Sequence, residues 1–431
     1  MKGQALRGIS FQLALLGYAA VGVSVLNPLF NTTTRWFFLA LLGGTLLIRG
    51  KLFLALGTRL SFTVGLYCVW CMTTFLWSEI PALSLMKSVA LAATIITFVS
   101  AGKTWVRYWR PDLPLGFLMP IIPVALLAGF GPNGESEQSD TGFAVYYGLA
   151  GNPNFLGMLA ALGCPLALWL AYTTQHGRKK ITVRYGLSIG LLLLLAVILI
   201  RSGSRASLLC FVMIGISFVM ALRPERRLAL FLYAALVGIG AIIAVPAIQQ
   251  STYQRFVIKG AQDNDLFYSR RQPWIASLDA AEQGGILGVG YGVSAGDANF
   301  KGGLTAELYG REKGNAQLAV WEETGLIGLA LYVVLLAQMI WYFAFSLKAM
   351  RTQDERVQFA LLLGILLGLL VQSGFEAWWS APGSLEASYF WATVGVALGL
   401  RERVLGHQHA IRTVPLPRFG LNMMSRSVSR R

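Results

Sequence analysis

The sequence has few charged residues and very few histidines. Charged residues make up 13% of its 431 residues, and there are three histidines. A soluble domain of this size carries about a quarter charged residues, so the composition argues against an ordinary soluble protein. No set of histidine, cysteine and acidic residues has the spacing of metal ligands. The sequence therefore implies neither a metal site nor a cofactor.

Cysteine is also scarce, which limits redox chemistry. The four cysteines are Cys68, Cys71, Cys164 and Cys210, and each lies within an apolar run. Cys68 and Cys71 form a C-x-x-C, but small side chains on a buried helix serve packing more often than redox exchange. We therefore expect these residues to be packed and unreactive.

What the chain has in abundance is long apolar runs. Residues 187–200 (LSIGLLLLLAVILI) and 228–248 reach or approach the roughly 20 apolar residues that cross about 30 Å of hydrocarbon. Several such runs in one chain predict an all-α polytopic membrane protein with about twelve transmembrane helices. No cleavage site of the signal-peptide kind follows the first run, so we expect it to be retained.

Acidic residues are too few to balance the basic ones, and the formal net charge is +16. The basic residues gather in short loops between apolar runs, which is typical of cytoplasmic loops. When successive loops are assigned to alternate sides of a bacterial inner membrane, both termini lie on the cytoplasmic side. Anionic lipids at the cytoplasmic face are the expected partners of these loops, and nucleic acid is not expected.

The same alternation divides the chain into four parts. Residues 1–249 hold transmembrane helices 1–9, 250–314 form a periplasmic loop, 315–400 hold helices 10–12, and 401–431 form a basic cytoplasmic tail. A loop as long as 250–314 is usually functional. Its aromatic residues predict a small cap over the membrane face.

Two outward segments break the charge rule, and they hold the best candidate site residues. In the first segment, Arg201 and Arg205 are four residues apart and would share a helical face if the turn between them is helical. Arg201 suits snorkelling and function equally, whereas function is favoured for Arg205, because guanidinium suits phosphate oxygens.

The second segment is the long loop, where Arg270 and Arg271 precede Trp274. They are followed by Gly288-Val-Gly290-Tyr-Gly292. A fixed arginine ahead of a glycine-rich turn suits anion binding. The glycines alone are weak evidence without the strand and helix of a nucleotide fingerprint, and they equally fit a tight turn.

Further polar candidates stand at the starts of two spans. Asn152 and Asn154 flank Pro153, which fits a helix cap with proline in the first turn. Asn315 opens the tenth expected span, and Glu323 within that span should face the protein interior, since lipid exposure would be costly. Each of the four is a candidate substrate-binding residue.

Together these features resemble the O-antigen ligase and polymerase superfamily of bacterial envelope glycan transferases. The resembling pieces are Gly151-Asn-Pro-Asn154, Ser204-Arg205, Arg270 four residues before Trp274, Gly288-Val-Gly290, and Asn315 followed by Glu323-Thr-Gly-Leu-Ile-Gly328. They occur in the family's order over about residues 150–330.

The resemblance implies a GT-C-like fold and an inverting, metal-independent glycosyltransferase. Its glycan donor would be linked to undecaprenyl pyrophosphate, and its acceptor would be a sugar or the lipid A-core. Arg205 and Arg270 occupy positions whose arginines hold the pyrophosphate, with Arg201 and Arg271 beside them. Two guanidiniums would stabilise the charge that develops on the leaving group.

One departure from the family concerns the acceptor hydroxyl. Ligases usually carry a histidine immediately before the Asn of the tenth-span motif, and this chain has Gly314 there. In place of the histidine, Glu307, Glu312 and Asp265 are possible bases for the acceptor hydroxyl. The departure favours a repeat-unit polymerase over the alternatives of an O-antigen ligase or a protein O-glycan transferase.

A transporter or flippase of lipid-linked sugars is the alternative of another class. It needs charged residues deep in the bundle and two accessible states. Besides Glu323, only Lys87 and Glu376 are candidates. Lys87 is expected to be a snorkelling or paired lysine.

Overall fold

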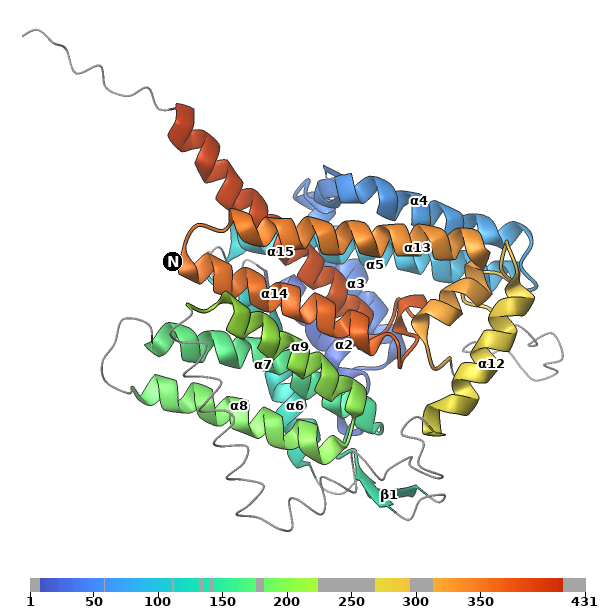
Figure 1. Cartoon of the computed structure of the whole chain (residues 1–431), viewed down its shortest axis with the longest axis horizontal. Coiled ribbons are helices and arrows are strands. Elements are labelled where there is room, and N and C mark those ends of the chain that lie inside the picture. The colour runs from blue at the N-terminus through green and yellow to red at the C-terminus, as the bar shows by residue number, and fades with distance from the viewer. Residues whose placement is uncertain are drawn as a thin grey trace, which may run out of the picture.

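The structure is a computed structural model that describes residues 8–57, 59–110, 112–131, 135–138, 143–175, 182–223, 268–294 and 313–413. For residues 57, 59, 135–138, 143–145, 175, 268–273 and 407–413 it describes the backbone alone. These ranges are mainly helical, as the sequence predicts (Figure 1). The helices are α2 (Ile9–Ala20), α3 (Thr32–Ile48), α4 (Arg59–Thr73), α5 (Pro81–Thr104), α6 (Ile121–Phe130), α7 (Pro153–Gln175), α8 (Val183–Ser202), α9 (Arg205–Ala221), α12 (Tyr268–Gly284), α13 (Ala316–Ala349), α14 (Gln353–Gln372) and α15 (Leu385–Thr413).

Short irregular segments connect several of the helices. Most are 3₁₀ turns, and one is a turn of π-helix at Trp105–Trp109 that extends α5. The 3₁₀ turns are Ser24–Leu26, Leu52–Gly57, Thr74–Leu76, Pro114–Leu118 and Trp378–Ser380.

One small departure from the expected all-α fold follows α6. β1 (Glu135–Gln138) pairs in antiparallel register with β2 (Phe143–Tyr146), so that Glu135 lies opposite Tyr146. The aromatic and β-branched residues of β2 suit an extended backbone. The pattern of apolar runs, which identified the helices, gave no indication of this pair.

The helices have the length and surface of a polytopic membrane protein. Four are long and apolar enough to cross a membrane: Pro81–Trp109, Pro153–Thr174, Val183–Ser202 and Ala316–Ala349. Large apolar side chains such as Ile48, Phe62 and Trp341 are 89%, 77% and 67% exposed, which suits contact with lipid. The count of twelve remains a prediction, because the ninth expected span (228–248) lies outside the described residues.

Helices that follow one another in the sequence are mostly antiparallel, so their starts and ends gather at two opposite ends of the bundle. We call one the site end, defined by the starts of α7, α9, α13 and α15 and the ends of α8 and α14 (Figure 1). At the other end, Lys103 pairs with Glu402 at 2.8 Å, and Tyr172 donates to Asp354 at 3.0 Å.

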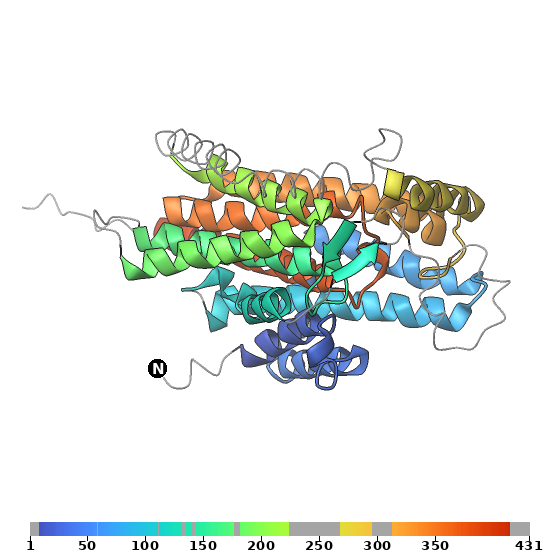
Figure 2. The same ribbon diagram turned by 90° about the horizontal axis from the view of Figure 1, so that it is seen from below.

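Glycines allow the central helices to pack closely. A Cβ on Gly102 of α5 would lie 2.6 Å from the Ala392 carbonyl of α15, and one on Gly395 of α15 would lie 2.3 Å from the Val99 carbonyl of α5. Gly368 of α14 makes a similar approach to Cys210 of α9. Small residues at helix contacts are typical of membrane bundles. A perpendicular view places α2 and α3 along one side of this bundle (Figure 2).

The cysteines take part in this packing. Cys71, Cys164 and Cys210 are fully buried and Cys68 is 8% exposed, and all four are free thiols. The prediction that they are small packing residues is therefore confirmed.

Candidate functional site

The break between α8 and α9 separates Arg201 from Arg205. α8 ends at Ser202, and Gly203 follows with a φ of 62°, a left-handed conformation that glycine adopts without strain. α9 begins at Arg205 itself. The turn between the two arginines is therefore not helical, and the condition under which they would share one face is not met, because the glycine ends one helix and the next takes a new direction.

The two arginines have different surroundings. The Arg201 guanidinium lies over the Tyr146 ring, 3.8 Å from its centroid, which stabilises a cation at this boundary. Arg205 occupies the first turn of α9 and is partly exposed. The Ser204 side chain caps α9 by accepting from the Ser207 N–H, so the start of the helix holds the base of the Arg205 side chain in place.

The start of α7 lies directly against the start of α9. A Cβ on Gly157 would lie 2.9 Å from Ser204 and from the Ser207 hydroxyl, and that hydroxyl donates to the Asn154 carbonyl at 3.3 Å. Asn152 caps α7, with its side-chain oxygen accepting from the Asn154 N–H at 2.7 Å. The cap predicted for this segment is therefore confirmed for Asn152.

Asn154 has a different partner, the carboxylate of a distant glutamate. Its amide donates to Glu376 Oε1 at 2.6 Å across 222 residues of sequence. Glu376 lies in the turn that follows α14, here called the 373–376 turn (Ser373–Glu376). Both side chains are partly exposed, so the pair is accessible at the surface of the site end.

The 373–376 turn also receives the start of α13. The Asn315 amide donates to the Gly374 carbonyl at 3.1 Å, and the Gln317 amide donates to the Ser373 hydroxyl at 2.9 Å. Asn315 also caps α13, accepting from the Gln317 N–H at 2.8 Å. One short turn thus joins α14 to the starts of both α7 and α13.

The cap helix α12 contacts the same turn through its tryptophan. The Trp274 ring lies 6.0 Å from that of Phe375, and the Trp274 indole donates to the Gly314 carbonyl at 3.0 Å. Gly314, for which the resemblance predicted a histidine, is buried. α12 crosses the site end of the bundle beside the start of α13 (Figure 1).

Arg270 and Arg271 lie in the first turn of α12. Their side chains lie outside the described part, so their convergence with Arg205 remains a prediction. Glu307, Glu312 and Asp265 also lie outside it, as do the three histidines' side chains.

α13 is broken at Gly325, whose φ is 68°. The break frees backbone groups, and the glycine-rich turn supplies partners for them. Val289 and Gly290 donate to the carbonyls of Glu322 and Glu323 at 3.0 Å each, and Leu326 donates to Gly285 at 3.1 Å. Freed backbone groups at membrane depth need such partners. The turn therefore stabilises the break.

Successive N–H groups of the glycine-rich turn are used within the protein. In addition to Val289 and Gly290, Tyr291 donates to the Thr74 hydroxyl at 2.9 Å and Gly292 to Glu323 Oε2 at 2.8 Å. An anion cradle needs such N–H groups for its ligand. The motif is therefore a tight turn rather than an anion cradle. The side chain of Tyr291 within it is also buried, and burial raises the pKa of its hydroxyl.

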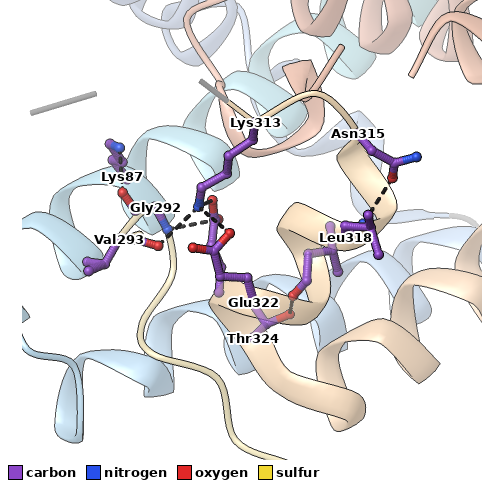
Figure 3. A network of polar contacts seen from close by, with 10 residues as sticks. Lys87, Gly292, Val293, Lys313, Asn315, Leu318, Glu322 and Thr324 are labelled. Carbon is purple, nitrogen blue, oxygen red and sulfur yellow. Dashed lines mark hydrogen bonds and ion pairs between the residues drawn. The ribbon is translucent and has the colours of Figure 1, made fainter. Parts of the chain in front are cut away.

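A buried ion pair lies beside the break (Figure 3). Lys313 Nζ is 2.6 Å from Glu323 Oε1, 3.5 Å from Glu322 Oε2 and 3.1 Å from the Val293 carbonyl. The Lys313 and Glu323 side chains are 8% and 2% exposed. Glu323 thus faces the interior as predicted, where it holds the Gly292 N–H and the Lys313 ammonium in place.

Lys87 belongs to the same network. Its ammonium donates to the Gly292 carbonyl at 2.6 Å (Figure 3). Its expected role as a paired lysine is confirmed. Within the ranges that the structure describes, no group of three or more His, Cys, Asp or Glu residues is placed to hold a metal ion.

Comparison with known proteins supports the resemblance. Residues 190–333 match the family model described as O-Antigen ligase. The chain is also 26% identical over 318 residues to the exopolysaccharide production protein ExoQ of Rhizobium meliloti (strain 1021), which covers 71% of this chain and 69% of that protein. Both matches support the O-antigen ligase and polymerase superfamily.

Proposed function

Starting from this superfamily relationship, we propose that the protein is a glycosyltransferase that polymerises surface-polysaccharide repeat units. It moves glycan from undecaprenyl pyrophosphate to a sugar acceptor, with inversion and without a metal, in a GT-C-like bundle of twelve spans. The site end faces the periplasm of a bacterial inner membrane. The opposite, more basic end contacts anionic lipids at the cytoplasmic face of the membrane.

The observation that carries this proposal is the position of Arg205. It lies in the first turn of α9, and the starts of α7 and α13 meet the same end of the bundle. Helix N-termini favour negative charge, and arginine binds phosphate oxygens in a fixed fork. A lipid diphosphate that reaches this end from the membrane would meet both.

The chemistry requires little beyond charge stabilisation. Pyrophosphate is already a good leaving group, and negative charge grows on it as the glycosidic bond breaks. A guanidinium at Arg205 stabilises that charge, and Arg270 on α12 is proposed to act with it. Asn152, Asn154 and Asn315 would orient the sugars, with Arg201 and Arg271 near the diphosphate. Glu323 holds the turn behind them, since it is already paired with Lys313.

Polymerase is favoured over ligase for two reasons. Gly314 provides no imidazole, and its carbonyl is bound by Trp274. The relative is named for exopolysaccharide production. A ligase that transfers to the lipid A-core is the second candidate, supported by the description of the matching family model.

Transport is less well supported by the charged groups that the structure describes. Lys87, Glu323 and Glu376 were its candidates, and each bonds to a protein group at the site end. A pathway through the membrane needs charged groups deep in the bundle, which these three do not provide.

The test is turnover by the purified protein in proteoliposomes supplied with a polyprenyl-pyrophosphate-linked oligosaccharide. The wild type is expected to lengthen the glycan with donor alone, whereas a ligase would need added lipid A-core. Arg205→Ala should lower turnover about 100- to 1000-fold, and Arg205→Lys should rescue poorly because the fork is lost.

Arg184→Ala is the matched control, because Arg184 is exposed at the opposite end of the bundle. It should turn over donor like the wild type. Unchanged product length in Arg205→Ala would refute the proposed role of the guanidinium.

A further inference from the structure

An apolar groove lies between α3 and α5. It encloses about 490 Å³, and the described residues that line it are apolar apart from Thr97. Small residues leave this space open: at Gly43 a Cβ would come no closer than 3.6 Å to a neighbour, and at Gly44 it would meet nothing within 4 Å. Met86 and Val89 of the lining are 58% and 48% exposed. The groove therefore opens toward lipid.

A cation stands at one end of the groove. Arg35 precedes Trp36 of the lining, and its guanidinium lies 5.6 Å from the centroid of the Trp36 ring. None of the ion pairs between described residues involves Arg35, and its Nε has no hydrogen-bond partner among them. Arginine in a membrane helix is costly without a partner. The groove thus ends at a positive charge that no described carboxylate pairs with.

Arg35 borders the site end of the bundle. Its Nη1 donates to the Gly383 carbonyl at 2.7 Å, and Gly383 lies between the 373–376 turn and the start of α15. The turn between α2 and α3 touches the start of α7, since a Cβ on Gly22 would lie 2.5 Å from the Phe155 ring. An anion held at Arg35 would therefore carry an attached sugar to the site end.

From Arg35 the groove extends toward the opposite end of the bundle. Its lining reaches Phe53 in the 3₁₀ turn whose Leu54 carbonyl accepts from Lys103 at that end. From Trp36 to Ile48, the last residue of α3, the helix rises about 18 Å, whereas one leaflet of hydrocarbon is about 15 Å deep. The groove therefore suits a chain that passes the middle of the bilayer, which favours a polyprenyl chain over the acyl chain of a phospholipid.

We propose that this groove binds the prenyl chain of a lipid-linked acceptor, whose pyrophosphate is held by Arg35. The inference rests on the proposed function, because a polymerase joins two lipid-linked glycans and so needs a second lipid site. The guanidinium fork matches phosphate oxygens. α3 and α9 lie on opposite sides of the bundle (Figure 2), so a lipid at Arg35 is separate from one at Arg205.

Photolabelling tests the groove without turnover. The probe is undecaprenyl pyrophosphate that carries a diazirine in its prenyl chain, mixed with the purified protein in proteoliposomes. It should label peptides of α3 and α5, and excess undecaprenyl pyrophosphate should remove this labelling, whereas excess phosphatidylglycerol should not. Gly44→Phe, which fills the groove, should lower the labelling about tenfold, the scale of an overpacked apolar contact. Arg205→Ala should leave it unchanged.

Gly190→Phe is the matched control for Gly44→Phe. Gly190 lies on α8, outside the groove, and a Cβ there also meets nothing within 4 Å. This variant should be labelled like the wild type, because the same bulky side chain is added to a membrane helix without filling the groove.

Turnover tests the cation. With a donor whose own acceptor hydroxyl is blocked, the concentration of a lipid-linked acceptor can be varied alone. Arg35→Gln should raise the acceptor KM about 10- to 100-fold, the contribution of a charged hydrogen bond, and kcat should change little. Arg35→Lys should recover part of the loss, since an ammonium also binds phosphate.

Two results would overturn the inference while leaving the proposed function intact. One is labelling that phosphatidylglycerol removes as well as undecaprenyl pyrophosphate does, or that persists in Gly44→Phe, which would show an ordinary lipid contact. The other is a wild-type acceptor KM in Arg35→Gln. A wild type that makes no product would instead overturn the proposed function, and with it the acceptor role of the groove, even where the groove is labelled.

Discussion

At the scale of single residues, the pairing of Lys313 with Glu323 is the clearest energetic feature. Two charges removed from water are costly unless their geometry and hydrogen bonds compensate for the lost hydration. Here the ammonium also donates to the Val293 carbonyl, and Glu323 also accepts from Gly292. The pair therefore links the cap segment to α13.

We expect Glu323→Gln to destabilise the protein by about 3–5 kcal/mol, the usual cost of breaking a buried pair. The loss arises because Lys313 would keep its charge with a weaker partner. Denaturant unfolding of the protein in detergent micelles measures it. Glu79→Gln, an exposed site at the same end, should change little. Equal stability of the two variants would show that the pair contributes nothing.

The sequence predicted the location of a single residue well where the free-energy cost of exposing its charge to lipid decides that location. Glu323 was placed inside because a charge in an apolar run cannot face lipid. Its partner was not predicted, since Lys313 precedes the span and reaches Glu323 only through the fold. The partner of Glu376 was not predicted either, because Asn154 lies 222 residues away in the sequence.

At the scale of elements, the break in α13 determines how the cap meets the membrane helices. α13 has 34 residues and would be about 50 Å long if straight, which exceeds the roughly 30 Å of hydrocarbon. The break at Gly325 lets its first turns leave the axis of the span. The indole of Trp70 donates to the freed Thr324 carbonyl at 2.9 Å.

Gly325→Ala should disrupt this element. A Cβ there would lie 2.1 Å from the Ile286 carbonyl, and the positive φ is strained for alanine. We expect a lower melting temperature and faster proteolysis between residues 285 and 315. Gly186→Ala in α8, where a Cβ meets nothing within 4 Å, is the control. Equal proteolysis of both variants would contradict the role of the break.

The helices themselves were predictable from apolar runs, but their breaks were not. Arg201 and Arg205 fit one helix by spacing, and only the left-handed Gly203 separates them. A glycine inside an apolar run is tolerated in a continuous helix. At Gly325 in α13 the break depends on backbone bonds to the 285–290 segment, and such tertiary contacts are not visible in the pattern of apolar residues.

At the scale of the whole molecule, the charge pattern predicts which loops share a side of the membrane. Among the residues that the structure describes, Lys103 and Arg401 lie at one end of the bundle, and Asn154 and Asn315 lie at the other. The positive-inside rule assigns the end with Lys103 and Arg401 to the cytoplasm. The account's central claim is that the site end lies outside, where a lipid-linked glycan would meet Arg205.

Thiol labelling of intact cells tests this claim most directly. The four native cysteines are buried, whereas Glu79 at the site end and Arg351 at the opposite end are exposed. A membrane-impermeant maleimide should label Glu79→Cys in intact cells and Arg351→Cys only after permeabilisation. Labelling of Arg351→Cys alone in intact cells would place the site end in the cytoplasm and contradict the account.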